Sequence, residues 1–230
     1  MKILPLISLG IIASSAIALA PEALASTWRA AHRMSGFSAD SNYYLYLESS
    51  RDTGAGIPKA KLQIVQVAAN SCIKNGCIQT KYGEPDSRKS TKMAEDDLLK
   101  KSWKNRQTLK LTPPQIGTKL NIISRTPGAN GSETVAVKVN TAKPLQIRLE
   151  QRQKNASLGK ESAAMRLVIN HNGRQRVLGT LNNFQDWVFS YSIREVRLSP
   201  NGRNVVVLVD KTERTFEGVL KTTFVQGFVL

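Results

Sequence analysis

Three carboxylates, Glu48, Asp52 and Asp210, are the side chains of this 230-residue chain that could act together as an acid–base pair. Glycoside hydrolases place two carboxyl groups around the scissile bond, one as an acid and the other as a base or nucleophile. Nothing in the sequence brings Asp210 near the other two, and acids at such positions are usually exposed turn residues. A carboxylate-dependent hydrolase is therefore only the second alternative to the function that the rest of the sequence favours.

Other catalytic patterns are missing from the sequence. A nucleophile would need His32 or His171 beside an activated serine, and no G-x-S-x-G elbow is present. There is no P-loop and no G-x-G-x-x-G, and the glycine-rich stretch 54–58 precedes a strand pattern, which indicates a turn. We therefore expect a non-enzymatic protein that uses no cofactor and no metal ion.

Cys72 and Cys77 are the two cysteines of the chain. In an exported protein, an even and closely spaced pair indicates a disulfide. Strand patterns at 62–68 and 78–82, with a turn at 74–76, would place the two cysteines opposite each other. Cross-strand Cβ atoms are about 4.5–5.5 Å apart, which is close to what a disulfide needs.

The sequence also allows a second register around these cysteines. A two-residue turn at 75–76 would pair Lys74 with Cys77 and leave Cys72 opposite Gln79. Metal binding is a weaker alternative, because the chain has only two histidines, far away in sequence, and nothing resembles four-ligand spacing.

Positive charge is the strongest compositional feature of the chain, with a formal net charge of +16. Lysine and arginine are dense between residues 100 and 154, where the only acids are Glu133 and Glu150. A cationic surface attracts polyanions by Coulomb steering and counterion release. The candidate anion-binding residues are Lys100, Lys101, Lys104, Lys110, Arg148 and Arg152.

Several partners fit a cationic surface outside the cytoplasm. They are anionic lipid headgroups, phosphorylated glycans, teichoic-type polymers and stray nucleic acid, and an envelope protein is a further partner. Sequence-specific nucleic-acid binding is not expected, because Trp103 is the only aromatic residue in the basic segment and stacking platforms need several. The alternative is a solvated basic surface that serves only solubility.

The N-terminus has the pattern of a signal peptide. Lys2 precedes an apolar run at 3–20, and Ala23-Leu24-Ala25 forms a small-x-small cleavage site. The run is interrupted by glycine and serine and is marginal for spanning about 30 Å of hydrocarbon. We expect residues 1–25 to be removed, residues 26–230 to form one exported, β-rich domain in the periplasm or secreted medium, and no transmembrane segment in the mature chain.

One segment, residues 91–111, has helical character. Its acids come early and its lysines late, which suits the helix dipole. Asp96 with Lys100 and Asp97 with Lys101 are expected ion pairs at i,i+4 spacing. Leu99 and Trp103 would share the face that packs on a sheet, and prolines 113 and 114 end the helix.

Strand patterns dominate the rest of the chain. They predict antiparallel sheets in a sandwich-like or propeller-like arrangement. The expected strands are 28–35, 43–48, 62–68, 134–139, 145–151, 165–170, 176–181, 188–198, 205–210 and 222–229. The Asn172-Gly173 pair predicts a type I′ hairpin turn.

Two similar turn motifs, "FSADS" at 37–41 and "LSPNG" at 198–202, each precede a strand pattern. Each combines a serine, an acid or amide that can bond to nearby backbone, and a small residue that tolerates positive φ. Both are therefore expected to be tight turns between two strands. The alternative is two unrelated hairpins that use common turn residues.

Three sequence blocks carry a resemblance to a known family. They are "GFSADSNYYLYLE" (36–48), "GAGIPKAKLQIVQV" (54–67) and "LSPNGRNVVVLV" (198–209) followed by "FEG" (216–218). With these blocks the chain resembles an uncharacterised family of predicted secreted bacterial proteins, domain of unknown function 2259. The resemblance implies a secreted protein and supplies no activity or catalytic residue.

The two turn motifs by themselves also resemble the short repeats of TolB-type and WD40-like propellers. They lie 161 residues apart, however, whereas propeller blades repeat about every 40 to 45 residues. A complete propeller is not expected. The function predicted from the sequence is an envelope-associated, non-enzymatic interaction or structural protein, and the first alternative is a cationic module for anionic polymers or lipid headgroups.

Overall fold

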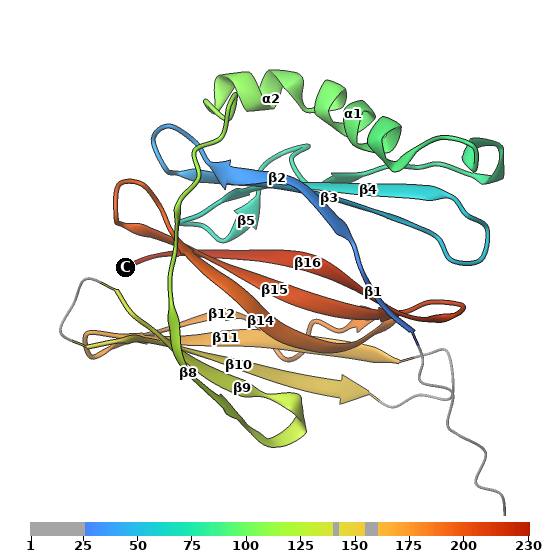
Figure 1. The fold of residues 1–230 in the computed structure, drawn as a ribbon. Coiled ribbons are helices and arrows are strands. Elements are labelled where there is room, and N and C mark those ends of the chain that lie inside the picture. The colour runs from blue at the N-terminus through green and yellow to red at the C-terminus, as the bar shows by residue number, and fades with distance from the viewer. Residues whose placement is uncertain (1–25, 140–142, 155–160) are drawn as a thin grey trace, which may run out of the picture.

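The computed structural model describes residues 26–139, 143–154 and 161–230, and the expected signal peptide lies outside them. Its elements form four stacked layers: a helical layer, an upper sheet, a middle sheet and a lower sheet (Figure 1). The prediction of a mainly β fold with antiparallel sheets and a helical insertion is confirmed, and the sheets stack face to face. In these described ranges no helix is long and apolar enough to cross a membrane.

Each sheet combines strands that are close in sequence, with two exceptions in the middle sheet, an N-terminal strand and a two-residue strand at 118–119. The upper sheet contains β2 (Ala31–Phe37), β3 (Tyr43–Arg51), β4 (Pro58–Gln66), β5 (Ser71–Cys72) and β6 (Ile78–Gln79). The middle sheet has the order β1 (Ser26–Arg29), β16 (Gly218–Val229), β15 (Asn204–Arg214), β14 (Val188–Leu198) and β7 (Thr118–Lys119). The lower sheet has the order β12 (Arg174–Gly179), β11 (Ser162–His171), β10 (Leu145–Lys154), β9 (Glu133–Val137) and β8 (Ile122–Pro127), with β13 (Gln185–Asp186) beside β11.

The middle sheet is buried on both faces, which explains the continuously apolar sequence of β15. Val205, Val207 and Val209 belong to the core shared with the lower sheet. Val206 and Leu208 belong to the core shared with the upper sheet. Since strand side chains alternate between two faces, an unbroken apolar run fits a strand that is covered on both sides.

A third apolar core joins the helical layer to the upper sheet. The predicted helix is present as two shorter ones, α1 (Thr91–Lys101) and α2 (Trp103–Thr108). The hydroxyl of Ser90 accepts a hydrogen bond from the N–H of Met93 and caps α1. The hydroxyl of Ser102 donates to the carbonyl of Leu98 at 2.8 Å, a back-bond that bends helices, and the break occurs there.

The packing face of the helix differs from the prediction. Ala94 and Leu98 are fully buried on the upper sheet, whereas Leu99 is partly buried and Trp103 is 50% exposed. Ser102, with φ of −89° and ψ of 1°, interrupts the helix, so the helical spacing between Leu99 and Trp103 does not continue into α2.

The two turn motifs have the same hydrogen bonds. In each copy the serine hydroxyl donates to the side chain two positions later and accepts from the backbone N–H five positions later. The third residue after each serine, Ser41 or Gly202, has a positive φ of 63° or 72°. The expected turns are confirmed, and they connect β2 to β3 and β14 to β15.

The disulfide between Cys72 and Cys77 is confirmed, with Cα atoms 5.7 Å apart. The turn predicted at 74–76 is present, and the N–H of Gly76 donates to the carbonyl of Ile73 there at 2.9 Å. It is not the hairpin turn that was predicted between the two strands, because β5 and β6 both pair with β4 and the chain reverses earlier, at 67–70. The N–H and C=O of Ile64 bond to Gly76 and Ile73, respectively. Lys74 and Asn75, which lie between Ile73 and Gly76, bulge out of the returning strand. The disulfide joins the residues on the two sides of this bulge.

Candidate functional site

The predicted carboxylates lead to a polar cluster between the upper and the middle sheet. Glu48 on β3 and Asp210 on β15 both lie in this layer, and they are 2% and 4% exposed. A cavity of about 380 Å³ opens beside Glu48 and is also lined by Lys61, Lys211 and Glu213. Two of the three predicted carboxylates therefore share one buried layer.

Glu48 and Lys61 both bond to the backbone of Thr223 on β16. The N–H of Thr223 donates to the two carboxylate oxygens of Glu48 at 2.8 and 3.1 Å. Lys61 lies directly opposite Glu48 on β4, and its ammonium donates to the carbonyl of Thr223 at 3.4 Å. Burial raises the pKa of the Glu48 carboxyl and lowers the pKa of the Lys61 amine.

Opposite pKa shifts of this kind are frequent at catalytic sites. Here, however, Glu48 and Lys61 form the backbone hydrogen bonds that a further strand beside β16 would otherwise form. The parallel strand β1 covers only residues 218–221 of β16. Beyond them, Gln63 donates to the carbonyl of Thr223 at 2.8 Å and accepts from the N–H of Val225 at 3.3 Å. Asn70 accepts from the N–H of Gly227 at 2.8 Å.

The other edge of the middle sheet, β14, is closed in the same way by the lower sheet. Strand β7 pairs with β14 only at residues 197–198. The Gln151 amide donates to the carbonyl of Tyr191 at 3.1 Å and accepts from its N–H at 2.9 Å. Glu133 accepts from the N–H of Ile193. Polar side chains of the two flanking sheets thus seal both edges of the middle sheet.

The remaining predicted carboxylates are bound by cations. Asp210 accepts two hydrogen bonds from the guanidinium of Arg29, one of them at 2.7 Å. Asp52 accepts from the N–H of Gly54 at 3.1 Å and from Lys59 at 2.6 Å, within the loop between β3 and β4. Asp52 is therefore a turn acid, and the structure does not place it in the buried layer with the other two.

The two histidines lie in different layers. His32 stacks on Tyr46 of the upper sheet, with ring centroids 5.1 Å apart, and burial lowers its pKa. His171 ends β11 of the lower sheet. In the part of the chain that the structure describes, no group of three or more histidine, cysteine or acidic side chains could hold a metal ion.

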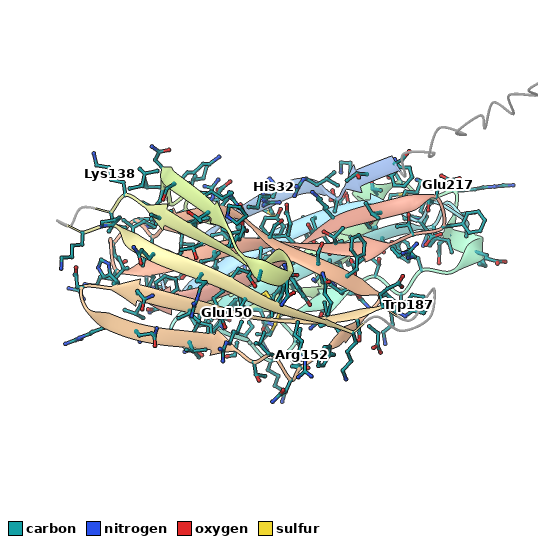
Figure 2. All side chains as sticks on the ribbon, turned by 90° about the horizontal axis from the view of Figure 1, so that it is seen from below. His32, Lys138, Glu150, Arg152, Trp187 and Glu217 are labelled. Atoms are coloured by element: carbon teal, nitrogen blue, oxygen red, sulfur yellow. A yellow bond between two sulfur atoms is a disulfide. The ribbon has the colours of Figure 1, made fainter. Side chains whose placement is uncertain are left out.

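The six candidate anion-binding residues fall into two groups at opposite ends of the stack. Arg148 and Arg152 lie on β10 and face outward from the lower sheet, and Figure 2 shows Arg152 and Glu150 on this sheet. Arg148 forms an ion pair with Glu150 at 2.6 Å. Lys100, Lys101 and Lys104 lie on α1 and α2, and Lys110 follows the end of α2. The structure therefore does not bring the two groups together, because the helices and the lower sheet are at opposite ends of the stack (Figure 1).

The acids of α1 are engaged by residues other than the predicted lysines. Asp96 pairs with Lys92 at 2.7 Å and with Arg33 at 2.8 Å, and Asp97 accepts a hydrogen bond from Tyr82. Glu95 is buried and pairs with Arg33. The predicted i,i+4 pairs with the later lysines are therefore wrong, because Arg33 and Lys92 engage Asp96 and the hydroxyl of Tyr82 engages Asp97.

The later lysines are left exposed by this arrangement. Among the described residues, none of the four forms an ion pair with a carboxylate within 4.0 Å. They are Lys100, Lys101, Lys104 and Lys110. Asn105 of α2 donates to the carbonyl of Lys74 at 3.3 Å, so the disulfide loop, with its own exposed lysine, lies against this end of the helical layer. We call these five lysines the basic helix face.

Apart from Glu48, the residues that seal the sheet edges were not singled out by the sequence patterns. Gln63 lies between the buried Leu62 and Ile64, Gln151 lies opposite the buried Met165, and the two amides are 3% and 6% exposed. An amide at a core-facing position of a strand needs buried hydrogen-bond partners. A glutamine at such a position in the sequence is therefore the signal that could have identified these residues.

A comparison with protein-family models places residues 49–226 in the family described as "Predicted secreted protein (DUF2259)". No curated protein matches the chain in a sequence search.

Proposed function

Because the chain belongs to the family of predicted secreted proteins with DUF2259, we propose that it acts outside the cytoplasm as a non-enzymatic interaction domain. Its basic helix face binds a phosphate-bearing component of the envelope, either lipid headgroups or an anionic polymer. Removal of residues 1–25 leaves Ser26, the first residue of β1, at the N-terminus.

The observation that carries this proposal is the distribution of partners in the helical layer. Glu95 and Asp96 of α1 pair with Arg33 and Lys92, and Asp97 accepts a hydrogen bond from Tyr82. The lysines of the basic helix face have no carboxylate partner among the described residues. A group of unpaired, solvated cations on one layer is free to exchange its counterions for phosphates.

The non-enzymatic part of the proposal is supported by the use of the buried carboxylates. Glu48 accepts the N–H of a strand edge, and Asp210 is held by a two-pronged arginine contact. Asp52 bonds to backbone N–H groups of its own turn. Each carboxylate thus has a structural contact that a catalytic role would have to disrupt.

The expected binding is weak and depends on salt. Each cation near an anionic membrane contributes about 1 kcal/mol at low ionic strength, so reversing three lysines weakens binding by roughly a hundredfold or more. The Debye length falls to about 3 Å at 1 M salt, which removes most of the attraction. Arg148 and Arg152 cannot reach the same flat surface, because they lie on the far side of the stack.

The test is co-sedimentation of the mature chain with anionic and neutral vesicles across a salt series. The test variant carries Lys100→Glu, Lys101→Glu and Lys104→Glu, and the matched control carries Lys138→Glu, Arg148→Glu and Arg152→Glu on the lower sheet. The proposal predicts salt-sensitive binding to anionic vesicles that only the helix variant loses. Equal losses of vesicle binding in both variants would mean that binding depends on the net charge of the protein and not on the basic helix face. Equal binding to neutral and anionic vesicles would overturn the proposal.

A competition arm separates the two phosphate sources. A polyphosphate or teichoic-type polymer that displaces the protein from vesicles at low concentration identifies the polymer as the preferred ligand, whereas failure to displace identifies the lipid surface.

A further inference from the structure

Strand β12 is the outermost strand of the lower sheet. In the described ranges it pairs with β11 and with no other strand, and its six residues span about 20 Å. An edge strand offers a row of unpaired N–H and C=O groups to another chain. The two edges of the middle sheet are sealed by side chains, and no side chain of the described residues covers the backbone of β12 in this way.

The hairpin register shows which groups of β12 are free. Asn172 and Gly173 form a two-residue turn with φ of 48° and 76°, so the flanking residues His171 and Arg174 form the first hydrogen-bonded pair. Bonded pairs recur at every second residue along an antiparallel ladder. The N–H and C=O groups of Gln175 and Val177 therefore point away from β11.

A groove runs along β12, between this strand and β16 of the middle sheet. Two cavities of about 420 and 690 Å³ share these two strands as walls. Their apolar lining includes Met165, Ile169, Phe224 and Phe228. We call this feature, bounded by residues 174–180 and 224–230, the edge groove.

The charged side chains along the edge groove have one sign. Neither cavity has an aspartate or glutamate among its lining residues, whereas Arg174 and Arg176 line the larger one. Arg174, Arg176 and the buried Leu178 are at every second position of β12, so both arginines lie on the same face as Leu178, which faces the middle sheet. Arg176 donates to the carbonyl of Val229 at 3.4 Å. Neither pairs with a carboxylate in the part of the chain that the structure describes.

We propose that an extended acidic segment of a partner protein adds to the lower sheet along β12. Its backbone bonds to Gln175 and Val177, its apolar side chains cover the edge groove, and its carboxylates meet Arg174 and Arg176. Backbone pairing supplies affinity in such strand addition, and side chains at alternate positions supply specificity. This site lies at the edge of the lower and middle sheets, shares no lining residue with the basic helix face and is independent of it.

The probe for this site is a fluorescein-labelled peptide of eight residues in which valine and glutamate alternate. Its binding to the mature chain is followed by fluorescence anisotropy. One control peptide replaces each glutamate by lysine, and a second carries methyl groups on alternate backbone nitrogens, which blocks strand pairing. The proposal predicts that only the unmethylated acidic peptide binds.

Protein variants locate the bound peptide. Arg174→Glu with Arg176→Glu weakens binding by about tenfold or more, whereas Arg148→Glu with Arg152→Glu, the same change on the outer face of β10, leaves it unchanged. Val177→Pro removes an outward N–H and abolishes binding, whereas Val177→Thr preserves it. Thermal unfolding of each variant verifies that it is folded.

Three results obtained with the two peptides and the arginine variant would overturn the proposal. They are no binding of the acidic peptide at about 1 mM, equal binding of the methylated peptide, or unchanged binding to a folded Arg174→Glu, Arg176→Glu variant. Loss of peptide binding in the Lys100, Lys101, Lys104 variant would also contradict it, because that variant alters only the basic helix face.

Discussion

The side-chain amide of Asn204 donates a 2.6 Å hydrogen bond to the backbone carbonyl of Ser41. Asn204 follows the second turn motif, and Ser41 is the positive-φ residue of the first. The two motifs, far apart in sequence, therefore touch where the upper and middle sheets stack. The contact between the motifs fixes the position of the two sheets relative to each other. Neither motif has to be a binding or catalytic site.

Substitutions in these turns have opposite expected effects. Gly202→Val destabilises the fold by roughly 1–3 kcal/mol, because a β-branched residue adopts positive φ poorly. The space around its Cβ is open, so the cost is conformational and not steric. Ser41→Gly is neutral or stabilises by up to about 1 kcal/mol, since Ser41 has φ of 63°. Denaturant unfolding measures both, and a Gly202→Val protein as stable as wild type would refute the argument.

Replacing Glu48 tests its role as a backbone acceptor. Glu48→Gln keeps an oxygen for the N–H of Thr223 and changes stability at pH 7 by less than about 1 kcal/mol. Glu48→Ala leaves that buried N–H without a partner and costs about 1–3 kcal/mol. Chemical denaturation of the two variants gives the comparison, and equal losses would contradict the assigned role.

The pH dependence of Glu48 follows from its raised pKa. The carboxyl has a higher pKa in the folded than in the unfolded state, where it is about 4.3. Its contribution is therefore fully present below the unfolded pKa and is lost as the pH rises through the folded pKa. The free energy of unfolding of wild type minus that of Glu48→Gln should fall between pH 4 and pH 7. A difference that rises over this interval would mean that the folded pKa is depressed.

Replacing Gln151 tests whether its hydrogen bonds to Tyr191 stabilise the β14 edge of the middle sheet. Gln151→Leu leaves the N–H and C=O of Tyr191 without partners and costs about 2–4 kcal/mol, because both groups are buried. Gln153→Leu, two residues along the same strand, loses one exposed bond to Phe189 and costs less than about 1 kcal/mol. Thermal unfolding ranks the two variants, and equal costs would count against the seal.

Removing the disulfide has a small and local expected effect. By loop-closure entropy, Cys72→Ser with Cys77→Ser costs about 2 kcal/mol, since the closed loop is short. Hydrogen exchange at Ile73 and Gly76 should accelerate more than at residues of β15. A cost above about 4 kcal/mol would show that the bulge supports more of the fold than its contacts indicate.

The strands with apolar or alternating patterns could be predicted from the sequence, and each predicted stretch overlaps a strand of the structure, with bounds that differ by up to four residues. The stretch 28–35 was predicted as one strand but forms two, since the chain crosses between sheets at Ala30. Strand β8 was missed because most of its side chains are exposed and it contains Pro127, so it has no apolar alternation. Local patterns report which residues are buried, not which sheet they join.

The sealed edges could not be predicted for a related reason. Thr223 bonds to Glu48, and Tyr191 bonds to Gln151, only because strands from different sheets come together in the stack. The exposure of the four helix-layer lysines was predicted correctly, but the separation of Arg148 and Arg152 from them depends on the order of the sheets.

The central claim is that the buried carboxylates hold the fold while the basic helix face binds the ligand. Its most direct test is the affinity of the folded Glu48→Gln protein for anionic vesicles, measured beside the Lys100→Glu, Lys101→Glu, Lys104→Glu variant. The account predicts wild-type affinity for Glu48→Gln and roughly a hundredfold loss for the lysine variant. Loss of binding in a folded Glu48→Gln protein, with binding retained by the lysine variant, would contradict it.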